Sequence, residues 1–324
     1  MTIEPGTRTM KADDAAIAAA ARCLRQGGLV AFATETVYGL GADAGNGEAV
    51  ARLYAAKGRP RFNPLISHVA DTEAAHRLAR FDAVAEQLAA AFWPGPLTLV
   101  LPRQPDCSVA DLALAGLDSI AVRVPAHRTA HALLEAFGGA VVAPSANRSG
   151  HVSPTTPAHV LTDLRGRIDM VIDAGPCAVG VESTIVSCLG APTLLRPGGL
   201  PRSDIERVLN TRLATAAATA TDAPLAPGML ASHYAPKAML RLDAQEAQAG
   251  EVLLGFGPAS DATLNLSPRG DLAEAAANLF SHLRALDATG VGTIAVMSIP
   301  REGLGEAIND RLARGAAPNT GNVR

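Results

Sequence analysis

The chain has 324 residues, of which 48% are apolar and 18% charged, enough for one large core or two smaller ones. Its apolar runs are short, and the N-terminal stretch MTIEPGTRTMKADD lacks the basic-then-apolar layout of a signal peptide, so we expect a cytoplasmic protein without membrane segments. The four cysteines form no CxxC pair and are too few to staple a chain of this length, which indicates free thiols in a reducing compartment.

Charge is distributed unevenly along the chain. Residues 1–212 carry 20 basic and 20 acidic side chains, whereas residues 213–324 carry 8 and 11. This balance argues against a broad nucleic-acid-binding face, which normally shows a basic excess. Only Lys11, Lys57 and Lys237 are lysines among the 28 basic residues. A lysine kept where arginine is otherwise used suggests a need for a compact ammonium group, and this draws attention to Lys57 and Lys237.

The first two thirds of the chain predict alternating helices and strands. DDAAIAAAARCLRQGG has acidic N-cap candidates and ends in two glycines, and the LVAFA that follows predicts a buried strand. Asn46 is expected to cap a helix that ends at Gly58. Further strands are expected at LISHV, PLTLVL, SIAVRV, VVAPSAN, MVIDAG and TIVSC, and further helices at DTEAAHRLA, DAVAEQLAAAF, HRTAHALLEAF and SDIERVL. This order predicts an α/β domain with a mixed sheet.

The character of the sequence changes after residue 210. TRLATAAATATDAPLAPG, residues 211–228, is rich in Ala, Thr and Pro without an apolar period and is typical of a linker. Beyond it, EVLLGFG and TIAVMSIP predict strands, while a stretch from Asp271 and GEAINDRLA predict helices. We therefore expect a second, smaller α/β unit.

A first polar constellation combines TETVYGLG with KGRPRFNPL, residues 57–65. A Gly-rich turn lets the backbone approach a ligand closely, and Lys57, Arg59 and Arg61 concentrate positive charge near a helix end. We expect Lys57 to be an exposed cleft residue that contacts polyphosphate. The alternative is a helix C-terminus whose cations merely complement its dipole. Neither a Walker A nor a GxGxxG pattern is present.

A second constellation, APSANRSGHVSPT, spans residues 143–155. Ser145, Asn147, Ser149 and Ser153 offer hydroxyl and amide groups that must be paired if they are buried. An ordinary polar loop would have the same composition. Because ligands of open α/β sheets lie where loops leave strand ends, the two constellations together favour a binding site.

Arg123 is the only charged residue in the apolar stretch SIAVRVP. A buried arginine needs an anion, and either a substrate carboxylate or phosphate or an internal Asp or Glu would serve. Glu182-Ser183-Thr184 and LRPGG add polar groups between strands, and PGMLASHYAPK brings His233, Tyr234 and Lys237 into a segment otherwise typical of a linker.

These stretches, with WPGPLTLVLP and VGVESTIV, resemble in order and spacing the long form of the threonylcarbamoyl-AMP synthase family. The K-x-R…S-x-N signature of that family stands here as Lys57, Arg59, Ser145 and Asn147. The resemblance implies a YrdC-like, twisted, open mixed sheet with flanking helices over residues 1–212, of which the first 12 or so form a tail. It also implies a linker and active-site lid at 213–238 and a smaller, Rossmann-like α/β domain at 239–324.

The resemblance also implies a reaction and its residues. The family forms threonylcarbamoyl-AMP and pyrophosphate from L-threonine, bicarbonate and ATP, and a partner enzyme then modifies adenosine 37 of ANN-decoding tRNAs. The implied catalytic residues are Lys57 and Arg59, with Mg²⁺ accompanying ATP and no metal ligand identified. The implied threonine pocket comprises Thr36, His68, Arg123, Ala143 and Ser183. The implied ATP contacts are Lys57, Arg59, Asn63, Ser119, Ser145, Asn147, Ser153, Arg196 and Tyr234.

Two other functions remain open from the sequence. One is an RNA-binding module, against which the charge balance and the 3% aromatic content weigh. The other is a carbamoyl-adenylate-forming maturation factor for hydrogenases, which shares the YrdC-like domain but would add paired CxxC zinc motifs. Direct contact with tRNA is not expected.

Overall fold

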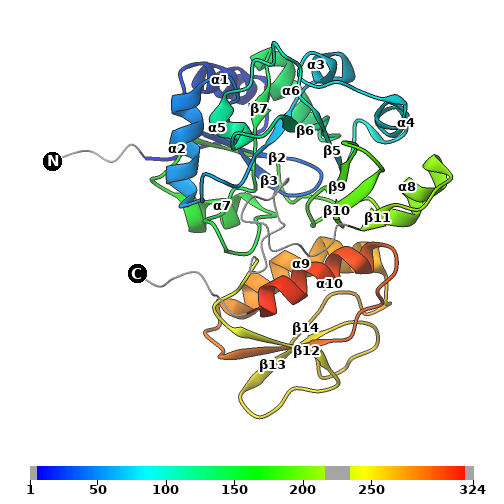
Figure 1. The fold of residues 1–324 in the computed structure, drawn as a ribbon. Helices are drawn as coiled ribbons and strands as arrows, with labels where there is room; N and C mark the ends of the chain where they lie inside the picture. The colour runs from blue at the N-terminus through cyan, green and yellow to red at the C-terminus, as the bar shows by residue number, and fades with distance from the viewer. Residues whose placement is uncertain (1–5, 216–233, 318–324) are drawn as a thin grey trace.

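The structure is a computed structural model that describes residues 6–215 and 234–317. These residues form two units, built on sheets of eleven and four strands (Figure 1). The large unit contains β1 (Arg8–Lys11), α1 (Asp14–Arg25), β2 (Val30–Ala33), β3 (Tyr38–Asp43), α2 (Gly47–Lys57), β4 (Ile66–His68), α3 (Thr72–His76), α4 (Ala83–Phe92), β5 (Leu97–Pro102), α5 (Asp111–Leu114), β6 (Ser119–Arg123), α6 (Arg128–Phe137), β7 (Val141–Val142), α7 (Pro157–Leu164), β8 (Met170–Asp173), β9 (Thr184–Ser187), β10 (Thr193–Arg196), α8 (Arg202–Leu209) and β11 (Ala214–Thr215). The small unit contains β12 (Met239–Ala244), β13 (Glu251–Gly255), β14 (Leu264–Asn265), α9 (Leu272–Asp287), β15 (Thr293–Met297) and α10 (Leu304–Ala316).

The large sheet is mixed, as the sequence predicts. Its strand order is β1-β8-β2-β3-β7-β4-β6-β5-β9-β10-β11. Strands β4 and β6 run parallel, with His68 opposite Arg123, whereas β5 runs antiparallel to β6. The parallel register therefore places an imidazole and a guanidinium, which are 55 positions apart in sequence, side by side at the carboxyl ends of their strands.

Strand β2 shows why its sequence is apolar throughout. All four residues of VAFA are buried. Val30 and Phe32 pack with α1 and α6, whereas Ala31 and Ala33 belong to the core on the opposite face, which includes residues of α2 and α4. A strand covered on both faces needs a continuous apolar run rather than an alternating one.

The helix boundaries follow from capping chemistry. The side chain of Asp13 accepts a hydrogen bond from the Ala16 backbone N–H at 2.7 Å and caps α1. Asn46 caps α2 in the same way, and Gly58 ends it with a φ of 62°, in the left-handed region that favours glycine. These limits agree with the predicted ones.

Several strands were not expected from the sequence, among them β10, β12, β14 and the three described next. Arg8–Lys11, expected to lie in a tail, forms β1 and pairs with β8 along the edge of the sheet. YGLGAD, read as a turn, forms β3, which pairs antiparallel with β2. Residues 214–215, expected in the linker, form β11 against β10. The partner of β1 is far away in sequence, so a local pattern does not reveal that strand, whereas β3 pairs with β2, the strand directly before it.

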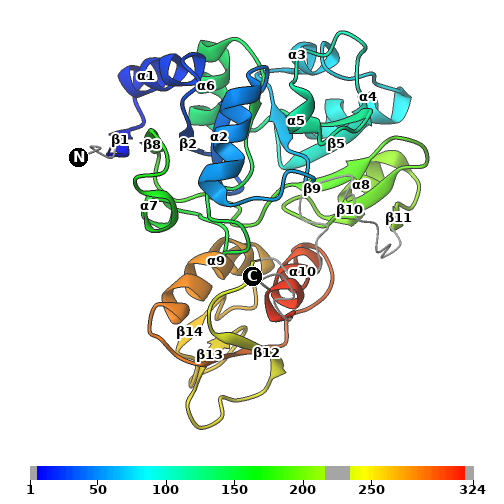
Figure 2. The same ribbon diagram turned by 60° about the vertical axis from the view of Figure 1, so that its left-hand side comes forward.

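The small unit is a parallel sheet in the order β12-β15-β13-β14, with α9 and α10 placed between it and the large unit in both views (Figures 1 and 2). Val152 and Val181 of the large unit share an apolar cluster with Phe280 of α9. A Cβ atom at Gly180 would lie 2.3 Å from the Ala276 carbonyl oxygen, and its φ is +80°. Glycine at 180 therefore permits the close approach of α9.

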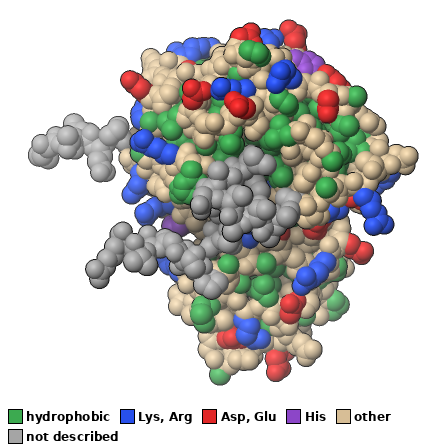
Figure 3. Space-filling view, viewed as in Figure 1, with side chains coloured by type: hydrophobic (Ala, Val, Ile, Leu, Met, Phe, Trp, Pro, Cys, Tyr) green, Lys and Arg blue, Asp and Glu red, His purple; other side chains and the backbone are tan. Residues whose placement is uncertain are grey.

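The surface carries charges of both signs. Figure 3 shows Lys and Arg side chains interspersed with Asp and Glu over the face it presents. This distribution agrees with the balanced composition of the chain. Among the described helices, none combines the length and the apolar character needed to cross a bilayer.

Candidate active site

A narrow pocket lies where loops leave the large sheet, beside the start of the small unit. Its volume is about 50 Å³. It is lined by Thr34, Thr36, Val37, Gly39, Arg59, Ile66, His68, Arg123, Ala143, Pro144, Ser145, Glu182, Ser183, Arg196 and Tyr234. The structure thus brings together nine of the fourteen residues that the sequence singles out, including the whole predicted threonine set.

Arg123 ends β6 and is held by three acceptors. Its Nε donates to the Gly95 carbonyl oxygen at 3.1 Å, and a terminal nitrogen donates to Thr36 Oγ1 at 3.1 Å. The other terminal nitrogen forms an ion pair with Glu35 Oε1 at 2.6 Å. Burial alone would raise the pKa of Glu35, but Arg123 holds it below its usual value. The internal partner that the sequence left open is therefore Glu35, and the fork faces the pocket in a fixed orientation.

His68 is buried beside Arg123. Its Nδ1 lies 3.2 Å from the Ile66 carbonyl oxygen. Burial first, and the positive charge of Arg123 second, lower the pKa of His68 to about 3. The ring is therefore neutral at physiological pH and contributes a donor or acceptor rather than a charge.

This neutral histidine predicts a pH effect on stability. The unfolded chain binds a proton on His68 below about pH 6.5 and the folded chain does not, so stability is lost as pH falls from 6.5 toward 3. His68→Gln should remove about 2 kcal/mol of the acid-induced loss between pH 7 and 4.5. Urea unfolding at both pH values measures this difference, with His131→Gln on the surface of α6 as the control. Parallel losses in wild type and His68→Gln would contradict the burial of a neutral ring.

Three guanidinium groups make the pocket attractive to anions. Arg59, Arg123 and Arg196 line it, against one lining carboxylate, Glu182. Arg59 donates to the Pro64 carbonyl oxygen at 3.1 Å, and burial lowers its pKa to about 10. Arg196 donates to the Ser183 carbonyl oxygen at 2.8 Å. Arg59 and Arg196 are anchored by backbone carbonyls, which leave their positive charge in place, whereas Arg123 is also paired with the Glu35 carboxylate.

Lys57 corrects one expectation. It is only 2% exposed and does not line the pocket. Its Nζ donates to the carbonyl oxygens of Ser145 and Asn147, each at 2.5 Å. Burial, and then the nearby charge of Arg59, hold the pKa of Lys57 well below its usual value. The lysine fixes the backbone of the S-x-N loop from behind instead of standing free in a cleft.

Four more predicted residues lie behind the lining or beside it. Asn63, Ser119, Asn147 and Ser153 are all buried. The Asn147 side-chain nitrogen donates to the carbonyl oxygens of Arg148 and His151 at 2.8 Å, which shapes the loop. The side-chain oxygens of Asn63 and Asn147 have no hydrogen-bond partner among the described residues. Ser119 begins β6, two residues before the Ala121 that pairs with Ile66.

Several lining residues escaped the sequence analysis. Thr34 and Gly39 lie within TETVYGLG but were not singled out as site residues, and Thr34 Oγ1 lies 2.8 Å from Thr36 Oγ1. Glu182 was noted only as a polar neighbour of Ser183, although it lines the pocket. Glu35 and Tyr38 of TETVYGLG do not line the pocket, and the Tyr38 hydroxyl donates to the Gly175 carbonyl oxygen at 2.7 Å. His233 lies outside the described residues.

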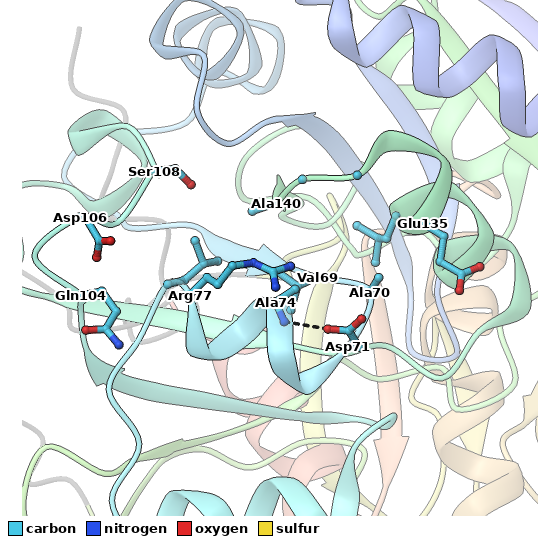
Figure 4. A pocket seen from close by; sticks show the side chains of 14 residues that line it. Val69, Ala70, Asp71, Ala74, Arg77, Gln104, Asp106, Ser108, Glu135 and Ala140 are labelled. Carbon is cyan, nitrogen blue, oxygen red and sulfur yellow. Dashed lines mark hydrogen bonds between the residues drawn. The ribbon is translucent and has the colours of Figure 1, made fainter.

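A larger cavity of about 810 Å³ lies around α3 and the end of α6 (Figure 4). Its acidic side chains, Asp71, Asp106 and Glu135, stand at separate places around it in Figure 4. Asp71 caps α3, because its side chain accepts a hydrogen bond from the Ala74 N–H at 2.7 Å. Arg77 forms an ion pair with Glu73 at 3.0 Å. This cavity contains none of the predicted site residues, and its acidic lining does not suit a polyphosphate.

The fold and the cationic pocket define an α/β protein that handles anionic substrates. Known proteins identify the class further. The family described as "Telomere recombination" (Sua5_yciO_yrdC) matches residues 22–198, and the "Threonylcarbamoyl-AMP synthase, C-terminal domain" family matches residues 200–317. The chain belongs to the threonylcarbamoyl-AMP synthase family.

Relatives along the whole chain support this assignment. The threonylcarbamoyl-AMP synthase of Bacillus subtilis is 40% identical over 331 residues, covering 96% of this chain and 95% of the relative. That of Pyrococcus abyssi is 43% identical, covering 91% and 92%. The crystal structure of P. abyssi Sua5 complexed with L-threonine matches with a TM-score of 0.88 and 40% identity, covering 96% of both chains. The activity is thus that of a nucleotidyltransferase in tRNA modification, rather than that of an RNA-binding module or a hydrogenase maturation factor.

Proposed function

We propose that the pocket joins L-threonine, bicarbonate and ATP into threonylcarbamoyl-AMP and releases pyrophosphate. The observation that carries the proposal is the juxtaposition of Arg123, Thr36 and His68 with Arg59 and Arg196 around one cavity. The first three suit a small amino acid with a carboxylate, and the last two suit phosphate. The threonine in the P. abyssi Sua5 crystal structure supports the amino-acid half of this division.

The chemistry needs orientation more than a protein nucleophile. The threonine amine adds to the carbon of bicarbonate with loss of water, and an oxygen of the resulting carbamate attacks the α-phosphorus of ATP as pyrophosphate leaves. Arg123 would orient the amino acid through its carboxylate, while Arg59 and Arg196 would offset the charge of the phosphates. Lys57 would act by holding the carbonyls of Ser145 and Asn147 in place.

Mg²⁺ enters this proposal as part of the substrate, MgATP. Within the described residues no group of three or more His, Cys, Asp or Glu side chains is arranged to hold a metal ion. The carboxylates nearest the pocket are already engaged, Glu35 with Arg123 and Glu182 with Ser153 and Arg311. Magnesium bound through phosphate oxygens and water agrees with its usual chemistry in ATP-using sites.

The walls of the pocket have to separate for catalysis. A volume of about 50 Å³ is far below the 300–1,000 Å³ or so of typical ligand sites. Tyr234 lines the pocket from the segment expected to form a lid, and the Ala235 N–H donates to the Gly150 carbonyl oxygen at 2.9 Å. Lys237 is exposed, and residues 216–233 lie outside the described part of the chain. Of the predicted lid at 213–238, we keep Tyr234 and Ala235 as the part that covers the site.

Pyrophosphate release tests the function. Purified protein with MgATP should release pyrophosphate only when both L-threonine and bicarbonate are present. The label of ¹⁴C-bicarbonate should appear in threonylcarbamoyl-AMP. Release without threonine, or threonine-dependent release without bicarbonate incorporation, would contradict the proposal. A cytoplasmic enzyme that hands its labile product to a threonylcarbamoyl-transferring partner, without binding tRNA itself, completes the proposed role.

A further inference from the structure

Arg311 of the small unit reaches the pocket of the large unit. It lies on α10 and is 1% exposed. Its Nε donates to Glu182 Oε2 at 2.7 Å, and a terminal nitrogen donates to its neighbour Asp310 at 2.5 Å. The second terminal nitrogen has no hydrogen-bond partner among the described residues. A fully buried guanidinium is thus committed to a carboxylate that lines the proposed ATP site.

Glu182 places a negative charge in the proposed ATP site. It is 6% exposed and lines the pocket, and its Oε1 accepts a hydrogen bond from Ser153 at 2.5 Å. Burial would raise the pKa of Glu182, but Arg311 first and Arg196 second hold it below its usual value, so the group is ionised. An ionised carboxylate in a buried site repels the triphosphate of ATP unless a cation neutralises it.

Arg311 also supports a second wall of the pocket. Its guanidinium carbon lies 5.0 Å from the centre of the Tyr234 ring. Tyr234 is 2% exposed, has a φ of +63° and stacks on Phe280 at 5.8 Å between ring centres. A residue other than glycine keeps a positive φ only where the surrounding structure fixes its backbone. Arg311 therefore touches two lining residues from outside the pocket.

The docking of the two units fixes where Arg311 stands. Arg284 of α9 pairs with Asp163 at 2.9 Å and donates to the Val152 carbonyl oxygen. Thr155 Oγ1 lies 2.9 Å from Ser281 Oγ. These contacts hold the segment that carries Ser153 against the small unit.

We propose that Arg311 is a positioning residue of the small unit that neutralises Glu182 and so allows the pocket to accept the triphosphate of ATP. The inference rests on the proposed function, because it assigns part of the ATP affinity to a side chain outside the pocket. The small unit then has a defined role, because it supplies the positive charge that balances Glu182 in a site otherwise formed by the large unit. Without Arg311, the negative charge of Glu182 would face the phosphates.

A double-mutant cycle tests the proposal. Arg311→Met should raise the KM for ATP by about tenfold or more, because a buried charge loses its partner, while the KM for threonine changes by less than about threefold. In a Glu182→Gln background the same Arg311→Met change should alter the ATP KM by less than about threefold, because position 182 carries no charge and Asp310, the other partner of Arg311, remains paired with Arg314. Calorimetric binding of a non-hydrolysable ATP analogue supplies a readout independent of turnover.

A matched control separates the loss of charge beside Glu182 from a general weakening of the contact between the two units. Arg202 and Glu306 form another ion pair between the large unit and α10, at 2.6 Å, and neither lines the pocket. Arg202→Met should leave the ATP KM within about twofold. An equal rise for Arg202→Met and Arg311→Met, or an Arg311→Met effect that persists with Glu182→Gln, would overturn the proposal.

Two further outcomes are distinguishable. Should Arg311→Met fail to fold, Arg311→Lys can replace it, because lysine retains the positive charge. An ATP KM of Arg311→Lys within about threefold of wild type would support the neutralisation of Glu182. A rise of about tenfold in this KM would overturn it. A wild-type protein without threonine-dependent pyrophosphate release would instead contradict the proposed function itself.

Discussion

Replacing Lys57 with methionine is expected to lower threonine-dependent pyrophosphate release by about 100-fold or more and to reduce the free energy of unfolding by about 2–4 kcal/mol. The Lys57 ammonium donates to two carbonyl oxygens of the S-x-N loop. Methionine fills the same space but leaves both oxygens buried without a donor, which costs about 1–3 kcal/mol each. The loop then shifts, and Ser145 leaves its place in the lining.

Steady-state kinetics and urea unfolding measure the two effects together. Lys237→Met is the matched control, because it also removes one of the three lysines but from an exposed position, three residues after Tyr234. The control should retain wild-type stability. An inactive Lys57→Met protein with unchanged stability would restore the sequence-based expectation of a free phosphate ligand. Full activity would remove Lys57 from the site altogether.

Local signals in the sequence account for most of the helices. Asp13, Asn46 and Gly58 mark helix ends by their own hydrogen bonds and backbone angles, so each can be read from a few neighbouring residues. The all-apolar VAFA likewise indicates a strand buried on both faces. Among the strands that were not predicted, β1 and β11 contain four and two residues and pair with β8 and β10 at places that their own sequences do not indicate.

The pocket was predictable as a set of residues but not as a set of roles. The motif matches brought His68 and Arg123 into one group, and the parallel pairing of β4 and β6 explains why they adjoin. Burial is not a local property, so Lys57 looked like an exposed cation although two carbonyls from a loop 88 and 90 positions away enclose it. The Glu182–Arg311 pair spans 129 positions and two units, and no spacing rule points to it.

Arg123→Lys is expected to raise the KM for threonine by about 100-fold while leaving the ATP KM within about threefold. Gly95, Thr36 and Glu35 already engage three of the five N–H groups of the guanidinium. An ammonium group has only three donors, and the same partners would occupy them. The substrate carboxylate would then lose its fork, and a 100-fold loss corresponds to about 2.7 kcal/mol.

The difference between the changes in the threonine KM and the ATP KM is what assigns Arg123 to one substrate. Arg59→Lys should show the reverse pattern, a larger rise in the ATP KM than in the threonine KM, because Arg59 is anchored to the Pro64 carbonyl oxygen on the proposed phosphate side. Equal effects of Arg123→Lys on both substrates would place Arg123 on phosphate. A loss of stability with neither KM changed would leave it as the partner of Glu35 alone, since the ion pair at 2.6 Å needs no substrate to explain it. Only a selective loss of threonine affinity assigns the remaining donors of the guanidinium to the amino acid.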